Sequence, residues 1–398
     1  MKISIITVVL NGVSTLEQTI QSVLGQDYPD IEYIIIDGGS TDGTLEIIKE
    51  HEHRLSFWMS ERDSGIYSAM NKGLQYATGD YVGFINSDDW YEDGAIGRVA
   101  DLMRSTLADV IYGDYYQVIS NGNKTLMTAR PLDYINISMP FCHQSVFVKR
   151  NTFSTFDVRY GVGADYKLLL DLYKTGVKFQ YYSGVISNFR MGGCADNGGY
   201  NTVIEHGIIA AEALIKSDSI MLVYGPTVLK NTIHAKMTLD LFSGKNHKSI
   251  QRCLDEIVPQ DDKIVIFGTG ELTNKFLGFI EKNNQRIKYY IDSDKNKEGG
   301  IILQKNIHTP DYLKSEEKCS VIVLNKRYCS EIVRLINNMN LSQGVKVFSY
   351  RDFEKRFWEA EAEHVLQTLS EQYKCIERLN ESLKKMDQEY INRILKCN

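Results

Sequence analysis

The sequence predicts an α/β protein that is built from more than one domain. The first half alternates short apolar runs, typical of buried strands, with stretches of helical periodicity. A second and smaller series of the same kind begins at residues 263–267, and the tail from Asp352 onward contains no glycine or proline. At 398 residues the chain is long enough for two or three domains.

The first strand is predicted over residues 3–10, where eight residues form one apolar run. A helix is expected to follow from Thr15 to Gly25. Ser14 would cap it, with Glu17 completing a capping box.

Two further strands are predicted at residues 31–36 and 81–85. The first runs into residues 37–44, a loop with the glycines and hydroxyls that suit a backbone close to a ligand. The second runs into Asn86-Ser87-Asp88-Asp89. Ligands of open α/β sheets bind at the carboxyl ends of the strands, so we expect the site there.

The adjacent carboxylates of Asp88 and Asp89 would be costly to bury unless their charge is compensated. A divalent cation on a diphosphate would compensate it, because hard cations prefer oxygen ligands. The alternative is a polar turn in which an aspartate caps a helix starting near Asp93.

Four segments together resemble the family-2 glycosyltransferases of the GT-A fold. They are IITVVLN at 5–11, DGGSTDGT at 37–44, GIYSAMNKG at 65–73 with ATGD at 77–80, and NSDD at 86–89. The resemblance covers about residues 1–195. It implies a GT-A nucleotide-diphospho-sugar transferase domain that moves a sugar from a nucleotide-diphosphate donor to an acceptor hydroxyl, with inversion at the anomeric carbon.

The resemblance implies donor contacts at named positions. Asp37 would face the nucleobase and accept the imide N–H of uracil, which favours UDP; a turn residue bonded to its own backbone is the competing interpretation. Asp89, with Asp88 direct or through water, would hold Mg²⁺ or Mn²⁺ and offset charge on the leaving UDP. Further expected donor contacts are Val8, Asn11, Asp63, Lys72, Asn86, Ser87 and Arg190.

One departure from the family pattern changes the weight given to these contacts. Met70 stands where many members carry an arginine, so Lys72 or Arg190 is expected to meet the diphosphate instead. Arg190 also opens a loop at 190–194 whose glycines could let it close over the donor.

Inversion needs a base for the acceptor hydroxyl, and the family places this carboxylate at the start of a helix. GADYKLLL at 163–170 matches, so Asp165 is the expected catalytic base; Asp157 is the second candidate, and a helix-dipole role for Asp165 the alternative. His143 and Gln144, in a segment that resembles the strand under the acceptor site, are expected to bind the acceptor or orient a carboxylate.

Residues 261–350 predict a small Rossmann-like domain, with strands near 263–267, 288–292, 320–324 and 345–348. Gly268-Thr269-Gly270 follows the first strand and Asp292 ends the second, but Thr273 takes the place of the third glycine. The unit resembles small domains attached to bacterial sugar-modifying enzymes. A nucleotide, a nucleotide sugar or no ligand at all is compatible with it.

The tail repeats apolar residues every seven positions, at Leu369, Ile376, Leu383 and Tyr390. Leu366, Tyr373 and Ile394 occupy the complementary positions. This favours a coiled-coil seam and a homo-oligomer. The alternative is a single helix packed on its own Rossmann-like domain.

The expected domains are therefore a GT-A domain at 1–198, a helical linker at 199–260, the Rossmann-like domain at 261–350 and the helical tail at 351–398. The expected function is transfer from a nucleotide-diphosphate sugar to a glycan or lipid-linked glycan, in surface polysaccharide synthesis. An NAD-binding oxidoreductase and a non-catalytic scaffold are the alternatives.

Composition limits the partners. The net charge of −6 argues against a broad basic field and hence against nucleic acid. The sequence has no run of 18 or more apolar residues, so no transmembrane helix is expected. The first apolar run carries no cleavage site and is needed as the first strand, so no signal peptide is expected either. Seven cysteines without a CxxC pair favour reduced thiols and argue against zinc. The expected location is the cytoplasm, with contact at the inner face of a membrane left open.

Overall fold

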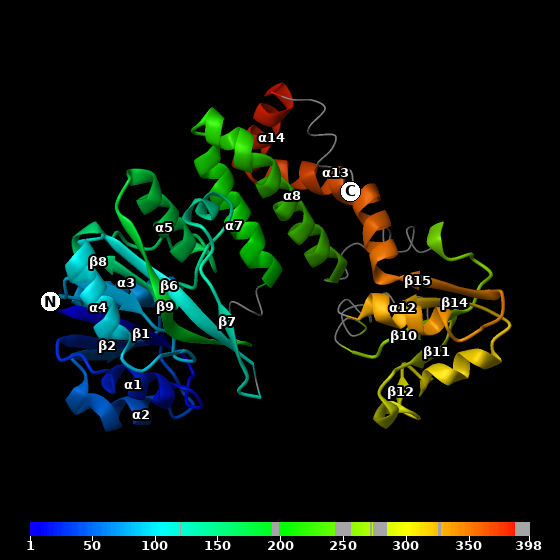
Figure 1. Cartoon of the computed structure of the whole chain (residues 1–398), viewed down its shortest axis with the longest axis horizontal. Helices are drawn as coiled ribbons and strands as arrows, with labels where there is room; N and C mark the ends of the chain where they lie inside the picture. The colour runs from blue at the N-terminus through cyan, green and yellow to red at the C-terminus, as the bar shows by residue number, and fades with distance from the viewer. Residues whose placement is uncertain are drawn as a thin grey trace. The chain divides into compact units, whose positions relative to one another are not determined.

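The computed structural model describes residues 1–119, 121–192, 199–242, 256–270, 273, 285–324 and 328–386 (Figure 1). The chain divides into two compact units, Met1–Ile220 and Met221–Asn398. The first unit extends beyond the expected boundary at residue 198 because α7 (Gly199–Leu214) belongs to it. Glu205 on α7 accepts hydrogen bonds of 3.0 and 2.9 Å from the backbone N–H groups of Gly161 and Val162.

The first unit is built on a nine-stranded mixed sheet, in the order β3-β2-β1-β4-β8-β6-β9-β5 with β7 paired to β6. Strands β1 to β4 run parallel to their neighbours in this group, and β8 is antiparallel to both β4 and β6. The bounds are β1 (Ile3–Val9), β2 (Ile31–Asp37), β3 (Phe57–Ser60), β4 (Tyr81–Phe84), β5 (Trp90–Tyr91), β6 (Val110–Val118), β7 (Lys124–Met127), β8 (Val146–Lys149) and β9 (Phe179–Arg190).

Alternate residues of β1 pack into two separate cores, because successive side chains of a strand point to opposite faces of the sheet. Ile6 and Val8 pack with residues of α3 and α5, whereas Ile5 and Val9 pack with residues of α1 and α4. Helices therefore cover both faces of the sheet, which explains why all seven residues of β1 are buried. The helices are α1 (Leu16–Leu24), α2 (Thr44–His51), α3 (Ile66–Tyr76), α4 (Ala95–Thr106) and α5 (Ala164–Thr175).

The expected cap at Ser14 is wrong. Helix α1 begins at Leu16, and its N-cap residue, Thr15, makes no side-chain capping bond. The carbonyl of Gly12 instead accepts the N–H groups of Thr15 and Leu16 at 3.0 and 2.9 Å, so a backbone turn starts this helix.

The second unit holds a six-stranded sheet in the order β12-β13-β11-β10-β14-β15. Its pairs are parallel except for β12 with β13, a hairpin that the sequence did not signal. Strands are present at all four predicted positions. The bounds are β10 (Ile264–Phe267), β11 (Ile287–Ile291), β12 (Ile301–Ile302), β13 (Lys305–His308), β14 (Lys318–Val323) and β15 (Gly344–Ser349), with α12 (Cys329–Asn337) between the last two.

The expected continuous coiled-coil seam is wrong. The tail forms two helices, α13 (Tyr350–Gln372) and α14 (Lys374–Met386), which are separated by extended backbone at Tyr373. Leu369, Ile376 and Leu383 are 0%, 0% and 3% exposed within their own chain. Tyr390 and Ile394 lie outside the described residues.

Helix α8 (Asp218–Phe242) supplies part of the cover over this stripe. A Cβ built on Gly225 would lie 3.2 Å from Leu379 and 3.3 Å from Leu383, so the helices meet closely at this glycine. The apolar stripe is thus buried within one chain over the part of the tail that the structure describes. Among the described helices, none combines the length and the apolar character needed to cross a bilayer.

Candidate active site

The loops that follow β1 and β2 are bonded to each other at the carboxyl edge of the sheet. Val9 and Asp37 are register partners at the ends of these strands, so the two loops leave the sheet side by side. Four hydrogen bonds of 2.7–3.1 Å each join a backbone N–H of one loop to a side-chain oxygen of the other. They run from Asn11 to Ser40, from Thr41 to Asn11, from Gly12 to Thr44 and from Val13 to Asp42.

Asp37 lies at the end of β2 and is 0% exposed. Its carboxylate accepts the backbone N–H groups of Gly39 and Ser40 at 2.9 and 3.0 Å, the hydroxyl of Ser60 at 2.6 Å and the hydroxyl of Ser40. Both oxygens are thus engaged by the protein. This geometry matches the competing interpretation, in which Asp37 shapes its own loop, better than a nucleobase contact through the carboxylate.

Asp89 follows β4 and is 1% exposed. Its Oδ2 accepts a hydrogen bond of 2.7 Å from Nε2 of Gln144, and its Oδ1 accepts one of 2.8 Å from the backbone N–H of Arg190. Burial, and then the adjacent charge of Asp88, raise the pKa of Asp89 well above its ordinary value. Burial also raises the pKa of Asp88, and the guanidinium of Arg190 offsets this in part.

The residues after β4 fit a hard divalent cation in part. Asp88 is only half-buried, and Oδ1 of Asn86 is a buried oxygen without a hydrogen-bond partner in the structure. Two protein oxygens with a diphosphate and waters are a donor set typical of Mg²⁺. Asp89 lies behind them with both oxygens taken. Among the described residues, no group of three His, Cys, Asp or Glu side chains is clustered as metal ligands.

Arg190 ends β9 beside this pair. Its Nε donates to the carbonyl of Asp88 at 3.0 Å, one terminal nitrogen donates to Gln18 at 2.6 Å, and the guanidinium lies 4.9 Å from the ring centroid of Trp90. The planar group is therefore held at the metal-motif loop, in keeping with the expected diphosphate contact. The sequence did not point to Gln18 or Trp90. Gly193 and Cys194 of the expected closing loop lie outside the described residues.

Three other expected donor contacts are engaged within the protein. Lys72 forms an ion pair of 2.8 Å with Glu61. Asp63 accepts the N–H of Gly65 at 2.9 Å. Its carboxylate also lies close to Gly38, because a Cβ built on that glycine would be 2.8 Å from Oδ2 of Asp63. Val8 is buried in the core, so its backbone alone is available to a ligand. Ser87 is half-buried, and its hydroxyl would lie 3.3 Å from a Cβ on Gly12.

Asp165 is the second residue of α5 and is half-buried. Its Oδ1 accepts a hydrogen bond of 3.0 Å from the hydroxyl of Tyr67 and one of 2.9 Å from the backbone N–H of Tyr166. The sequence gave no reason to single out Tyr67, although it lies in one of the family segments. The contact joins α3 to the start of α5.

His143 lies in a short 3₁₀ turn, His143–Ser145, and shares a small cavity with Asp165, Phe84 and Phe156. The cavity measures about 10 Å³, the room of a single water. Burial lowers the pKa of His143, and the charge of Asp165 opposes this, so the imidazole is neutral near pH 7. His143 therefore lies beside Asp165, the expected base, whereas Gln144 donates to Asp89.

Asp157, the second candidate base, is bound by Arg159. The guanidinium donates to both carboxylate oxygens at 2.5–3.0 Å, which lowers the pKa of Asp157. A carboxylate held by a guanidinium is a poor proton acceptor. The geometry therefore favours Asp165.

In the second unit, nearby side chains form hydrogen bonds with the Gly268-Thr269-Gly270 turn. Asp292 accepts the N–H of Thr269 at 3.1 Å and Nζ of Lys297 at 3.0 Å. Thr273, at the position of the missing glycine, is 0% exposed and donates its hydroxyl to the carbonyl of Gly268 at 2.5 Å. Asp292, the acid that would bind the ribose of a dinucleotide, is thus already engaged by Thr269 and Lys297.

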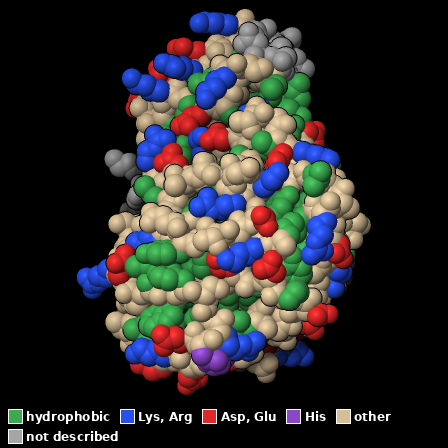
Figure 2. Space-filling view, turned by 90° about the vertical axis from the view of Figure 1, so that its left-hand side faces the viewer, with side chains coloured by type: hydrophobic (Ala, Val, Ile, Leu, Met, Phe, Trp, Pro, Cys, Tyr) green, Lys and Arg blue, Asp and Glu red, His purple; other side chains and the backbone are tan. Residues whose placement is uncertain are grey.

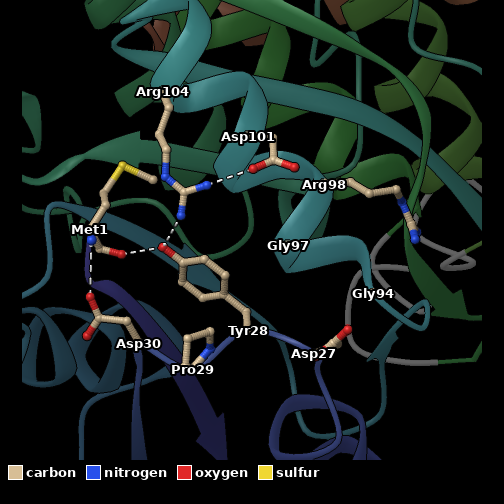
Figure 3. Close-up of a pocket in the computed structure, with 10 residues that line it drawn as sticks. All are labelled: Met1, Asp27, Tyr28, Pro29, Asp30, Gly94, Gly97, Arg98, Asp101 and Arg104. Atoms are coloured by element: carbon tan, nitrogen blue, oxygen red, sulfur yellow. Dashed lines mark hydrogen bonds and ion pairs between the residues drawn. The ribbon is translucent and has the colours of Figure 1, made fainter.

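One hollow of the first unit lies away from these residues, where β1 and β2 begin (Figure 3). It has a volume of about 650 Å³, and four of the charged groups that line it are paired: Met1 with Asp30 at 3.2 Å and Arg104 with Asp101 at 2.7 Å. Figure 2 shows acidic and basic side chains interspersed over one face of the molecule.

Comparison with known proteins decides the family. The family model "Glycosyl transferase family 2" matches residues 4–160. An uncharacterized glycosyltransferase of Haemophilus influenzae is 31% identical over 194 residues, which cover 47% of this chain and 78% of that protein. The chain belongs to glycosyl transferase family 2. The expected family and its GT-A fold class are thereby confirmed.

Other similarities to this glycosyltransferase are partial. A PGL/p-HBAD biosynthesis glycosyltransferase of Mycobacterium tuberculosis is 34% identical over 171 residues, or 41% of this chain and 66% of that protein, slightly less than two thirds of its length. Residues 260–347 match a second family model, "C2185-like, N-terminal".

Among solved structures, Staphylococcus aureus TarS 1-349 in complex with UDP is similar at 18% identity and a TM-score of 0.43, covering 59% of this chain and 81% of that one. The mannosyltransferase PcManGT from Pyrobaculum calidifontis, in complex with GDP-Man and Mn²⁺, is similar at 15% identity and a TM-score of 0.45, covering 60% and 74%.

Proposed function

We propose that this glycosyltransferase carries out metal-dependent, inverting transfer from a nucleotide-diphosphate sugar to a hydroxyl of a glycan or lipid-linked glycan. UDP is the first donor nucleotide to test. A role in surface polysaccharide synthesis is part of the proposal. It draws on the two relatives described above, which are glycosyltransferases, one of them of PGL/p-HBAD biosynthesis.

The observation that carries the proposal is the acidic charge after β4, which the protein compensates only in part. Two adjacent carboxylates have raised pKa values because of burial, and a neutral amide rather than a cation meets the deeper one. A protein that keeps such a pair sacrifices stability for it. A divalent cation supplies electrostatic stabilisation of the leaving diphosphate when it is bound.

Each residue would then have a separate role. Asp88 and Asn86 offer oxygens to the ion, and Asp89 holds the loop through Gln144 and the backbone of Arg190. The guanidinium of Arg190, fixed by Trp90 and Gln18, would bind the diphosphate. Asp165 would take the proton of the acceptor hydroxyl as the new glycosidic bond forms.

A thermal-shift panel tests the proposal: UDP, GDP, dTDP and NAD, each with and without Mn²⁺, on the full chain and on Asp88→Asn. We expect UDP to raise the melting temperature with Mn²⁺ only, and the shift to vanish in the variant. A shift from NAD without metal would instead support the oxidoreductase alternative. No shift from any nucleotide would support a non-catalytic scaffold.

A further inference from the structure

Tyr67 links α3 to the proposed base. Its hydroxyl donates a hydrogen bond of 3.0 Å to Oδ1 of Asp165, 98 residues further along the chain. The side chain is 7% exposed, and its ring lies 5.5 Å from that of Phe156. Burial, and then the charge of Asp165, raise the pKa of Tyr67 well above its ordinary value. The hydroxyl therefore keeps its proton at any working pH and is a permanent donor.

A second contact from the same face of α3 fixes the segment before α5. Asn71, one turn after Tyr67, donates from Nδ2 to the carbonyl of Phe156 at 2.9 Å and accepts the N–H of Phe156 at 2.8 Å. The helix thus holds the backbone of the preceding loop and the carboxylate of Asp165 at the same time. The carboxylate has little freedom to rotate away from the hydroxyl.

We propose that Tyr67 is a positioning residue for Asp165: its hydroxyl selects one orientation of the carboxylate. The inference rests on the proposed role of Asp165 as the base. A general base must be correctly placed when the acceptor arrives, and a hydrogen bond to one carboxylate oxygen limits how the group can turn. Tyr67 does not touch the reacting atoms in this scheme; it acts through Asp165.

Three buried titratable groups near Asp165 do not hold its carboxylate by charge. His143 and His206 are buried imidazoles whose pKa values are lowered by burial, and Cys142 is a buried thiol whose pKa is raised, so all three are neutral near pH 7. Glu205 on α7 is also close enough to raise the pKa of Tyr67, and it is itself an acid.

Tyr67→Phe tests the inference because it removes one oxygen and keeps the ring against Phe156. The first measurement is ¹³C NMR of the aspartate carboxyl groups, in which Asp165→Asn identifies the resonance of Asp165. We expect this resonance to move and to broaden, because the carboxylate loses the donor that fixes its orientation. The second measurement is UDP release from UDP-N-acetylglucosamine in Mn²⁺. We expect kcat to fall about tenfold, the size of one hydrogen bond to a charged group, while KM for the donor stays unchanged.

Tyr76→Phe is the matched control. Tyr76 is the last residue of α3, 41% exposed and stacked on Phe57 at 3.8 Å, so the same chemical change there should leave both measurements unaltered. An unchanged Asp165 resonance in Tyr67→Phe would overturn the inference, whatever happens to the rate. If the resonance moves while Asp165→Asn retains full activity, the base assignment fails and the inference with it. A higher KM for the donor in place of a lower kcat also overturns it, because a purely structural role predicts that result.

Discussion

Gln144 donates a hydrogen bond of 2.7 Å to Oδ2 of Asp89, 55 residues before it in the chain. The donor is a neutral amide, so the charge of Asp89 is held in place but not neutralised. With Asp88 adjacent, the loop after β4 carries a repulsion that the folded protein does not relieve by itself. Several predictions about this loop differ from those for an ordinary acidic turn.

Replacing Asp88 with Asn should not lower the stability of the metal-free protein. A raised pKa means that the ionised group destabilises the folded state at pH 7, so removing the charge should raise the melting temperature by about 1–3 °C. Differential scanning fluorimetry without metal checks this. The wild-type melting temperature should also rise as the pH is lowered from 7, until Asp88 is protonated, and this rise should be smaller in the variant. A melting temperature below that of the wild type would contradict the assignment.

Asp89→Ala should behave differently, although both variants should lose Mn²⁺-dependent UDP binding. The alanine leaves the Gln144 amide and the backbone N–H of Arg190 without acceptors in a buried position. We expect the free energy of unfolding to fall by about 1–3 kcal/mol. Urea denaturation and titration calorimetry with UDP and Mn²⁺ measure the two effects separately. UDP binding that keeps its metal dependence would refute the role of this loop.

Asp165→Asn should lower kcat by a factor of about 10²–10⁴ and leave the affinity for the donor nearly unchanged, because a base acts in the transition state. Stopped-assay kinetics and UDP binding give the two values. Asp157→Asn is the control, since its carboxylate is held by Arg159. Loss of donor affinity without loss of kcat would make Asp165 a binding or capping residue.

Glu32 should make the stability of the first unit pH-dependent. It is 6% exposed; burial on its own would raise its pKa, but hydrogen bonds from Lys2, Ser4 and Thr78 outweigh this and lower the pKa to about 2. A lowered pKa stabilises the fold above the unfolded-state value, and this contribution is lost as the pH falls from about 4.5 to about 2.

Glu32→Gln should therefore cost about 2–4 kcal/mol at pH 7 and progressively less towards pH 2. Denaturation followed by circular dichroism across this range measures it. Asp101→Asn, which removes one partner of an exposed ion pair with Arg104, should change the stability by less than about 1 kcal/mol. Parallel pH curves for wild type and Glu32→Gln would show that the carboxylate is not stabilised by its partners.

Ile376→Ala should destabilise the second unit and leave the oligomeric state unaltered. The side chain is 0% exposed within its own chain, so its truncation should cost about 2–5 kcal/mol through lost burial and the cavity left behind. Glu377→Ala, on the neighbouring exposed position, is the control. A change of molecular mass in light scattering, with an unchanged melting temperature, would instead support a coiled-coil seam between two chains.

The sequence predicted β1, β2 and β4 of the first sheet and four strands of the second, because runs such as residues 264–267 are apolar throughout and end in loops of distinct composition. The tail was predicted less well. A seven-residue repeat indicates that a helix has an apolar stripe. It does not indicate whether the stripe packs against a second chain or, as at Gly225, against another helix of the same chain.

The site shows the same division. The order and spacing of the family segments pointed to Asp88, Asp89 and Asp165, which the fold places at strand and helix ends. The sequence could not show that both oxygens of the Asp37 carboxylate accept hydrogen bonds from nearby residues of the protein. Nor could it show that Tyr67 donates a hydrogen bond to Asp165, 98 residues later in the chain. Such contacts depend on side-chain directions that tertiary packing sets.

The hydrogen bonds that cross between the loops after β1 and β2 also constrain how this enzyme can be altered. Because every one of them pairs a backbone group of one loop with a side chain of the other, the conformation of each loop depends in part on the other loop. Substitutions at Asn11 and Ser40 should therefore be non-additive. A chimera that takes one loop from a relative should fold poorly at this edge, whereas one that takes both should not. Changes of donor preference in this family member would then have to arise by coordinated rather than stepwise replacement.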